Sequence, residues 1–80
     1  MAEDPDVAQA RMFLQALIEE TTAVAAQLDD ARRLAAEARA RGNTALALWH
    51  EQQMKAHKRT LRELTRQSDN LRTRFPLTAE

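Results

Sequence analysis

The sequence predicts an all-α fold: an antiparallel two-helix hairpin of the coiled-coil type, which dimerises into a four-helix bundle. Three observations support this prediction. The 80 residues are rich in strong helix formers and include only one glycine and two prolines. Apolar residues recur at alternating steps of three and four, which is the heptad spacing of a coiled coil. The first half of the chain is acidic and the second half is basic.

The first helix is expected over residues 5–41. Asp4 can cap its start, and Pro5 suits the first helical position because no amide donor is needed there. We use the word seam for the stripe of residues that faces the other helix. The seam of the first helix is expected to hold Val7, Ala10, Leu14, Leu17, Thr21, Val24, Leu28, Ala31, Ala35 and Ala38.

A turn is expected at residues 42–43. Gly42 follows the last seam residue of the first helix, and glycine commonly ends a helix because it adopts left-handed backbone angles without strain. Either Asn43 or Thr44 can then cap a second helix through its side-chain oxygen.

The second helix is expected over residues 44–74, with Pro76 as its stop. Its predicted seam holds Ala47, His50, Met54, His57, Leu61, Leu64, Ser68, Leu71 and Phe75. The whole chain, residues 1–80, then forms a single helical-hairpin domain.

Folding at Gly42 would place small seam residues opposite large ones, for example Ala31 opposite Met54 and Ala10 opposite Phe75. It would also lay the acidic half of the chain beside the basic half, which favours the antiparallel pairing. Two alternatives stay open at this point. One is a continuous helix through Gly42 at a cost of about 1 kcal/mol, and the other is a domain-swapped dimer.

Several large apolar residues lie outside both seams, and two groups of them predict contact surfaces. We expect self-association through one group near the open end of the hairpin. Its members are Met12, Phe13 and Ile18. We expect an unidentified partner protein to bind the second group near the turn, because tryptophan is enriched in binding hot spots. Its members are Leu34, Leu48 and Trp49.

No motif of the sequence points to catalysis, so the chain is not expected to be an enzyme or to bind a cofactor. The two histidines, His50 and His57, are seven residues apart, about 10.5 Å along a helix, which is too far for one metal ion. We therefore expect them to lie in the seam or at its edge. A two-helix hairpin also offers no concave pocket for a small-molecule substrate.

A basic strip on the second helix predicts contacts with an anionic partner, either nucleic acid or an acidic protein surface. Basic residues at the turn extend this strip. The expected contact residues are Arg39, Arg41, Lys55, Arg59, Arg62 and Arg66. The competing interpretation is a salt-bridged face, in which Glu63 pairs with Arg59 or Arg62. A sequence pI of about 6.7 and the absence of aromatic residues within the strip weigh against nucleic acid.

The chain has no cysteine and no apolar run of the ~18 residues that a membrane span requires. Its acidic start lacks the basic and apolar regions of a secretory signal. We therefore expect a cytoplasmic protein without membrane contact. Arginine far outnumbers lysine, which indicates a GC-rich and hence bacterial genome.

The segment "EARARGN", followed by "EQQ", resembles the hairpin tip of the Gre-type transcript-cleavage factors. The resemblance implies a hairpin that enters the secondary channel of RNA polymerase. It implies no cleavage, because the acidic tip residues of that family have no counterpart between Glu37 and Glu51. The stretch "ARARGNTALALW" is also similar to the corner of a tetratricopeptide repeat. We interpret both likenesses as shared hairpin chemistry and assign no family.

These observations together predict a non-enzymatic protein–protein interaction or adaptor module that self-associates through helical faces. The alternative is a small regulator that binds the transcription machinery or nucleic acid through its basic helix face and hairpin tip.

Overall fold

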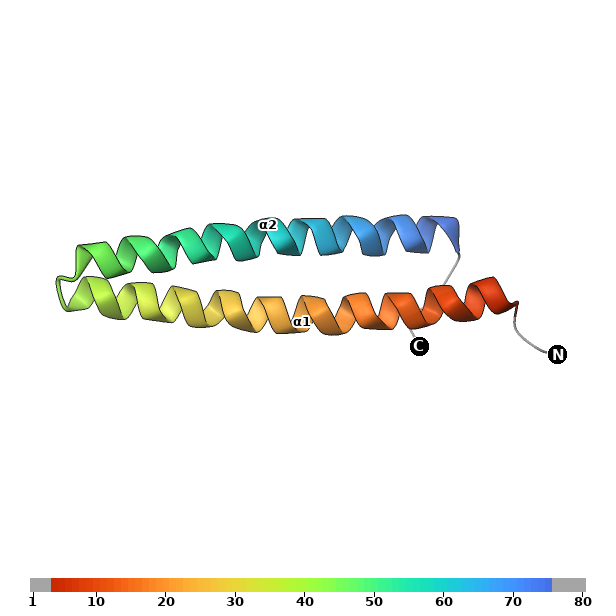
Figure 1. Cartoon of the computed structure of the whole chain (residues 1–80), viewed down its shortest axis with the longest axis horizontal. Coiled ribbons are helices and arrows are strands. Elements are labelled where there is room, and N and C mark those ends of the chain that lie inside the picture. Colours follow the sequence, from red (N-terminus) through yellow and green to blue (C-terminus); the bar gives the residue numbers. More distant parts are fainter. Residues whose placement is uncertain (1–3, 76–80) are drawn as a thin grey trace.

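The computed structural model describes residues 4–75, and two helices contain most of them. Helix α1 covers Pro5–Ala40 and helix α2 covers Thr44–Arg74. They lie side by side and antiparallel in a ribbon of 62 × 17 × 14 Å (Figure 1). This arrangement confirms the all-α helical hairpin. Helix α1 ends one residue before its expected end, and Pro76 lies outside the described residues. The four-helix bundle stays a prediction.

Both helices begin at side-chain caps. The Asp4 carboxylate accepts a hydrogen bond of 2.8 Å from the backbone amide of Asp6, and Pro5 occupies the first turn. The side-chain oxygen of Asn43 accepts a bond of 3.1 Å from the amide of Leu46, so Asn43 is the cap of α2. Each cap satisfies an amide that has no partner within its helix.

The turn between the helices is a Schellman motif centred on Gly42. Gly42 has a φ of 75°, in the left-handed region. Its amide donates to the carbonyl of Arg39 at 3.0 Å, and the amide of Asn43 donates to the carbonyl of Ala38 at 2.8 Å. These two bonds satisfy carbonyls at the end of α1. The chain therefore reverses at Gly42 and does not continue as one long helix.

We expect Gly42→Ala to destabilise the hairpin by about 1–2 kcal/mol, because a Cβ is strained in left-handed backbone geometry. No atom lies within 4 Å of the added Cβ, so the loss would come from the backbone alone. Gly42→Asn should lose less, since asparagine tolerates this conformation better. Thermal melts followed by circular dichroism would measure both losses. Equal melting temperatures for wild type and Gly42→Ala would contradict the prediction.

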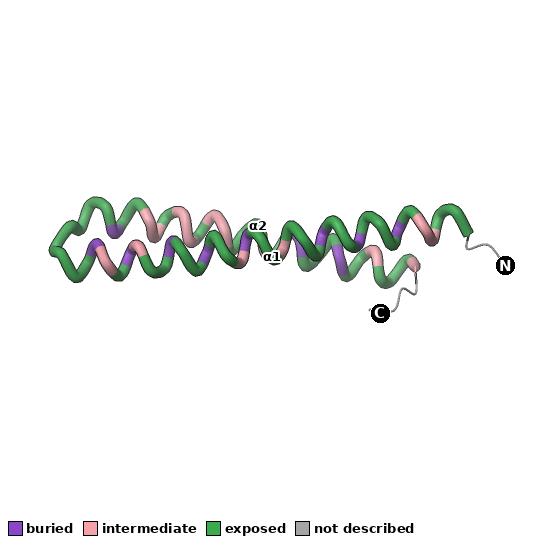
Figure 2. Tube along the Cα trace, turned by 90° about the horizontal axis from the view of Figure 1, so that it is seen from below, coloured by how far each residue is buried: buried purple, intermediate pink, exposed green. Residues whose placement is uncertain are grey.

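The predicted seams are where the structure is buried (Figure 2). Every predicted seam residue of α1 is buried, apart from Val7 and Thr21, which are half-buried. In α2, Ala47, Leu64 and Ser68 are buried, and the other predicted seam residues are half-buried. The heptad spacing therefore identifies the contact between the helices correctly.

The seam changes in character along the hairpin. Its open half contains the main apolar cluster of Leu17, Val24 and Leu64, with Leu61 and Leu71 packed against it. Toward the turn, the buried apolar residues are all alanines, namely Ala31, Ala35, Ala38 and Ala47. Small side chains let two helices approach closely, but they bury little apolar surface. The core is therefore thin, and it is thinnest near the tip.

Candidate interaction faces

A ribbon of two helices has two broad faces, and heptad positions assign the residues beside the seam to one or the other. We name the faces after one residue of each. The Trp49 face carries Phe13, Leu34, Leu46 and Trp49 among its apolar residues, with Glu20, Asp30 and Glu63. The opposite Lys58 face carries Ile18 and Leu48, with Arg32, Arg39, Glu51, Lys55, Lys58 and Arg62. The grooves of the hairpin agree with this division, since each is lined from one side.

The tip of the Trp49 face brings together two of the three predicted partner-binding residues. Leu34 and Trp49 line an open groove of about 270 Å³ together with His50 and His57. Trp49 is 57% exposed, and its ring meets that of His50 edge to face at a centroid distance of 5.0 Å. Leu48 is exposed as well but does not line this groove. Its position, next to Trp49 in sequence, places it on the opposite face.

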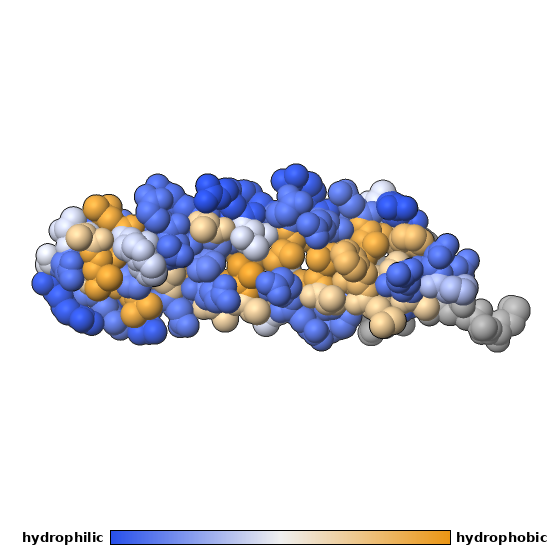
Figure 3. All heavy atoms as spheres, in the orientation of Figure 1, coloured by the Kyte–Doolittle hydropathy of each residue, from blue (hydrophilic) through white to orange (hydrophobic). Residues whose placement is uncertain are grey.

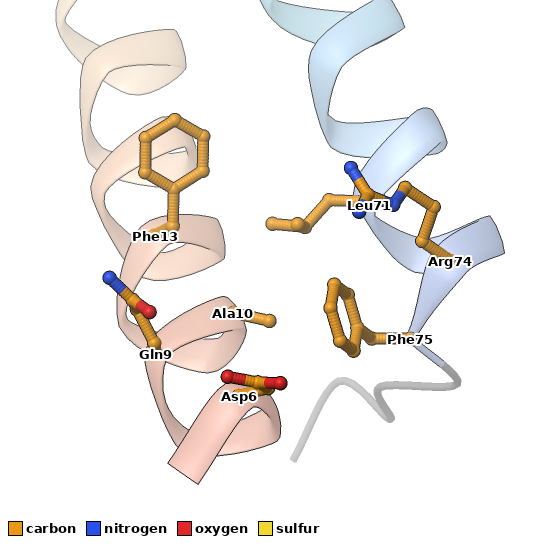
Figure 4. A pocket seen from close by; sticks show the side chains of 7 residues that line it. All are labelled: Asp6, Gln9, Ala10, Phe13, Leu71, Arg74 and Phe75. Atoms are coloured by element: carbon orange, nitrogen blue, oxygen red, sulfur yellow. The ribbon is translucent and has the colours of Figure 1, made fainter.

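A second groove lies at the open end of the same face. Ala10, Leu71 and Phe75 point into the space between the helices there, and Phe13 stands beside it (Figure 4). The guanidinium carbon of Arg74 lies 5.7 Å from the centre of the Phe75 ring, within the range of a cation–π contact. The groove is open to solvent, so Phe13 could be covered by another chain.

The predicted self-association residues do not form one patch. Successive helical residues point about 100° apart, so Met12 and Phe13 diverge although they are neighbours in sequence. Met12 projects from the narrow outer edge of α1, Phe13 lies on the Trp49 face and Ile18 lies on the Lys58 face. All three are exposed, with 74% of Met12 accessible to solvent.

No known protein family matches the chain. No curated protein and no solved structure matches it either. The residues that the structure describes include no group of three or more histidine, cysteine or acidic side chains placed to hold a metal ion. Neither helix, over its described length, is apolar enough to cross a membrane.

The predicted anionic-partner contacts are spread over three places. Lys55 and Arg62 lie on the Lys58 face with Arg39, whereas Arg59 and Arg66 project from the outer edge of α2. Arg41 lies at the tip, where it pairs with Glu37 at 3.5 Å. These residues therefore present no single flat surface to one ligand.

Several cations of α2 form no salt bridge within the part of the chain that the structure describes. Among residues 4–75, no salt bridge involves Lys55, Lys58, Arg59 or Arg62. Glu63, the acid expected beside Arg59 and Arg62, pairs with Arg66 at 3.2 Å instead. Within α2, the salt-bridged interpretation of the basic strip therefore holds for Arg66. It holds as well for Arg39 and Arg41, which extend the strip at the turn and pair with Glu51 and Glu37.

An ion pair that was not expected from the sequence joins the two helices. The guanidinium of Arg39 donates two hydrogen bonds to the carboxylate of Glu51, at 2.7 and 2.9 Å. These bonds hold the pKa of Glu51 below its usual value, with a further contribution from the positive charges of Arg39 and Lys55. The same hydrogen bonds, together with the charge of Glu51, raise the pKa of Arg39. The pair links the two helices beside the alanine-lined part of the seam.

This pair should make stability depend on pH. Because the pKa of Glu51 is depressed by folding, the pair stabilises the hairpin fully above the ordinary pKa of glutamate. Its contribution is then lost as the pH falls through the depressed value. We expect Glu51→Gln and Arg39→Gln each to reduce the loss of stability on acidification, measured as the urea midpoint at neutral and acidic pH. A variant that keeps the full pH dependence of the wild type would contradict this.

Hydrophobic residues gather in two areas of the surface. Figure 3 shows one area over the seam in the open half and another at the tip, with hydrophilic residues between them. The two grooves lie at the same two ends of the hairpin as these hydrophobic areas, each of which is small. Any partner that covers a whole face would therefore meet apolar ends and a charged middle.

Proposed function

We propose that this chain is a non-enzymatic protein–protein interaction module, which self-associates through the broad faces of its hairpin and presents its tip to a partner protein. One observation supports this most directly. Large apolar side chains, Phe13 and Trp49 among them, stay more than half exposed because their helical positions lie beside the seam. Burying such a side chain stabilises an association by about 1.5–3 kcal/mol.

The thin core supports the same proposal. No large side chain of the described residues is fully buried, and the tip half of the seam relies on alanine. Chains of this size commonly need a disulfide, a metal or a second chain for stability. This chain has no cysteine, and its described residues form no metal cluster. Association is the remaining source of stability, and a reducing cytoplasm is a compartment consistent with a cysteine-free protein.

Self-association can be tested with one variant for each broad face of the hairpin. Analytical ultracentrifugation over a wide range of concentrations should show wild-type assemblies larger than the monomer. Phe13→Ser and Ile18→Ser, which alter opposite faces, should each weaken assembly because each removes apolar contact area. Met12→Ser is the matched control, since Met12 is also exposed but projects from the outer edge. A wild type that stays monomeric throughout would refute self-association.

Binding of the partner protein at the tip can be tested with a variant and a matched control. Trp49→Ala should abolish capture of that partner, because the side chain lines the tip groove beside Leu34. Leu48→Ala removes an apolar side chain of similar exposure from the opposite face and should leave capture unchanged. Equal capture by wild type and Trp49→Ala would show that the groove is not the partner site.

A second candidate function is a regulator that binds nucleic acid or the transcription machinery. Four cations on successive turns of α2 favour it, because they form no salt bridge among the described residues: Lys55, Lys58, Arg59 and Arg62. Contacts would be to phosphates, and binding would fall steeply with salt. Titration of a fluorescent oligonucleotide at low and high salt would test this function, and no binding at low salt would eliminate the nucleic-acid version.

A further inference from the structure

The two broad faces of the hairpin differ in charge. Basic residues outnumber acidic ones on the Lys58 face, where Arg11, Arg32, Arg39, Lys55, Lys58, Arg62 and Arg72 accompany Asp29, Glu51 and Asp69. Acidic residues outnumber basic ones on the Trp49 face, where Asp6, Glu20, Asp30, Glu37 and Glu63 accompany Arg74. The formal net charge of zero therefore results from two faces of opposite sign.

Ion pairs within the Lys58 face leave its centre positive. Each acid of this face pairs with an arginine of the same face: Asp29 with Arg32, Glu51 with Arg39 and Asp69 with Arg72. Lys55, Lys58 and Arg62 have no such partner among the described residues. The contact between Arg39 and Glu51 sets the register of the helices, and one heptad further along each helix Arg32 comes opposite Lys58. Cations of both helices therefore lie opposite each other on this face.

The Trp49 face has the complementary centre. Glu20 has no hydrogen bond or ion pair within the part of the chain that the structure describes. Asp30 and Glu63 pair only with arginines of the outer edges, Arg33 and Arg66, which leaves their carboxylates exposed along the face. Exposed pairs of this kind are weak and can be rearranged by a nearby cation.

Both faces also carry exposed apolar side chains, so charge decides how two copies can stack. Stacking two Lys58 faces, or two Trp49 faces, would bring like charges together, which costs several kcal/mol in an interface. Stacking unlike faces covers Phe13, Trp49, Ile18 and Leu48 while cations meet carboxylates. We propose that a second copy of this chain docks with its Lys58 face on the Trp49 face of the first. This inference rests on the proposed self-association and names its surfaces.

Such an interface joins two different surfaces, so each added copy leaves one free face of each kind. Assembly then continues beyond the dimer unless the stack closes into a ring. It should also weaken with salt, since exposed charges are screened beyond about 10 Å at 0.1 M. A symmetric four-helix bundle would stop at two copies and would gain from such screening.

The experiment uses two sets of charge reversals in the full chain. One variant carries Lys55→Glu, Lys58→Glu and Arg62→Glu, which makes both faces acidic. The other carries Glu20→Lys, Asp30→Lys and Glu63→Lys, which makes both faces basic. Each variant alone should associate about tenfold or more weakly than wild type, and their equimolar mixture should recover association. Sedimentation at low salt measures all three samples.

The matched control separates position from net charge. Arg59→Glu changes the net charge by as much as Lys58→Glu alone, but Arg59 lies on the outer edge of the ribbon and, within residues 4–75, forms no salt bridge with an acid of the Trp49 face. This variant should associate like wild type. Circular dichroism of each variant checks that the hairpin is intact. A misfolded chain would also fail to recover association on mixing, so recovery separates a charge effect from misfolding.

The outcomes distinguish this inference from the proposed function. Salt-sensitive assembly and recovery on mixing support the stacking of unlike faces. If both reversal variants assemble as strongly as the wild type, self-association is supported but the assignment of faces is overturned. A mixture that stays monomeric, or a wild type that binds an oligonucleotide at low salt and stays monomeric, overturns the inference. A wild type that is monomeric under all conditions refutes self-association as well.

Discussion

Leu64→Ala should unfold most of this chain near physiological temperature. Leu64 is a buried member of the small cluster with Leu17 and Val24, and Leu61 and Leu71 pack against that cluster. Removing a buried leucine side chain costs about 2–5 kcal/mol, depending on how far the surroundings can collapse. Small domains have only about 5–15 kcal/mol of stability in total, and this one has a thin core. Each kcal/mol lost lowers the melting temperature by roughly 4–8 °C in a domain of this size.

The measurement is a thermal melt by circular dichroism, with wild type and variant at the same chain concentration because association adds stability. Leu48→Ala is the matched control, since Leu48 is half exposed and outside the seam. It should melt within a few degrees of wild type at a concentration where the chain is monomeric. A Leu64→Ala variant that melts with the control would show that the cluster does not hold the helices together.

Ala47→Leu should be the second strongly disruptive change, for the opposite reason. Ala47 is completely buried and Ala38 is 1% exposed, so the helices leave no space for added atoms beside the turn. Overpacking of this kind costs about 1–3 kcal/mol through strained side chains and displaced backbone. Separation of the helices would also stretch the hydrogen bonds between Arg39 and Glu51, which lie next to this site.

Ala45→Leu controls for the change in side chain. Ala45 lies in the same helical turn but is exposed, and leucine and alanine are both strong helix formers. The urea midpoint of Ala45→Leu should match the wild type, whereas that of Ala47→Leu should fall. Equal midpoints for both variants would mean that the tip half of the seam is looser than its alanines imply.

The hairpin is predictable from the sequence because several local signals agree. The steps of three and four place one stripe of residues along each helix, and the structure buries or half-buries that stripe from Val7 to Phe75. Gly42 and Asn43 add a helix end and a helix start at the only break in the pattern. Each signal depends on near neighbours in sequence, so a single chain is sufficient to detect it.

The faces were harder to predict, because closeness in sequence is not closeness on a helix. Met12 and Phe13 look like one group, yet they point about 100° apart, and so do Leu48 and Trp49. Heptad positions, extended from the seam to the flanking residues, would have separated them. The pair of Arg39 and Glu51 could have been found the same way, since both flank the seam on one side. What periodicity does not supply is which of several nearby cations an acid such as Glu63 selects.

The start of α1 and the end of α2 lie at the same end of the ribbon, 62 Å long, while the turn lies at the other (Figure 1). Tension applied to the two helix ends would therefore peel the helices apart one contact at a time, and would not slide them past each other as a whole. The leucine-rich half would bear the load first, and once it opened the alanine half would offer little resistance. A hairpin of this design yields to pulling at modest force and closes again from the turn.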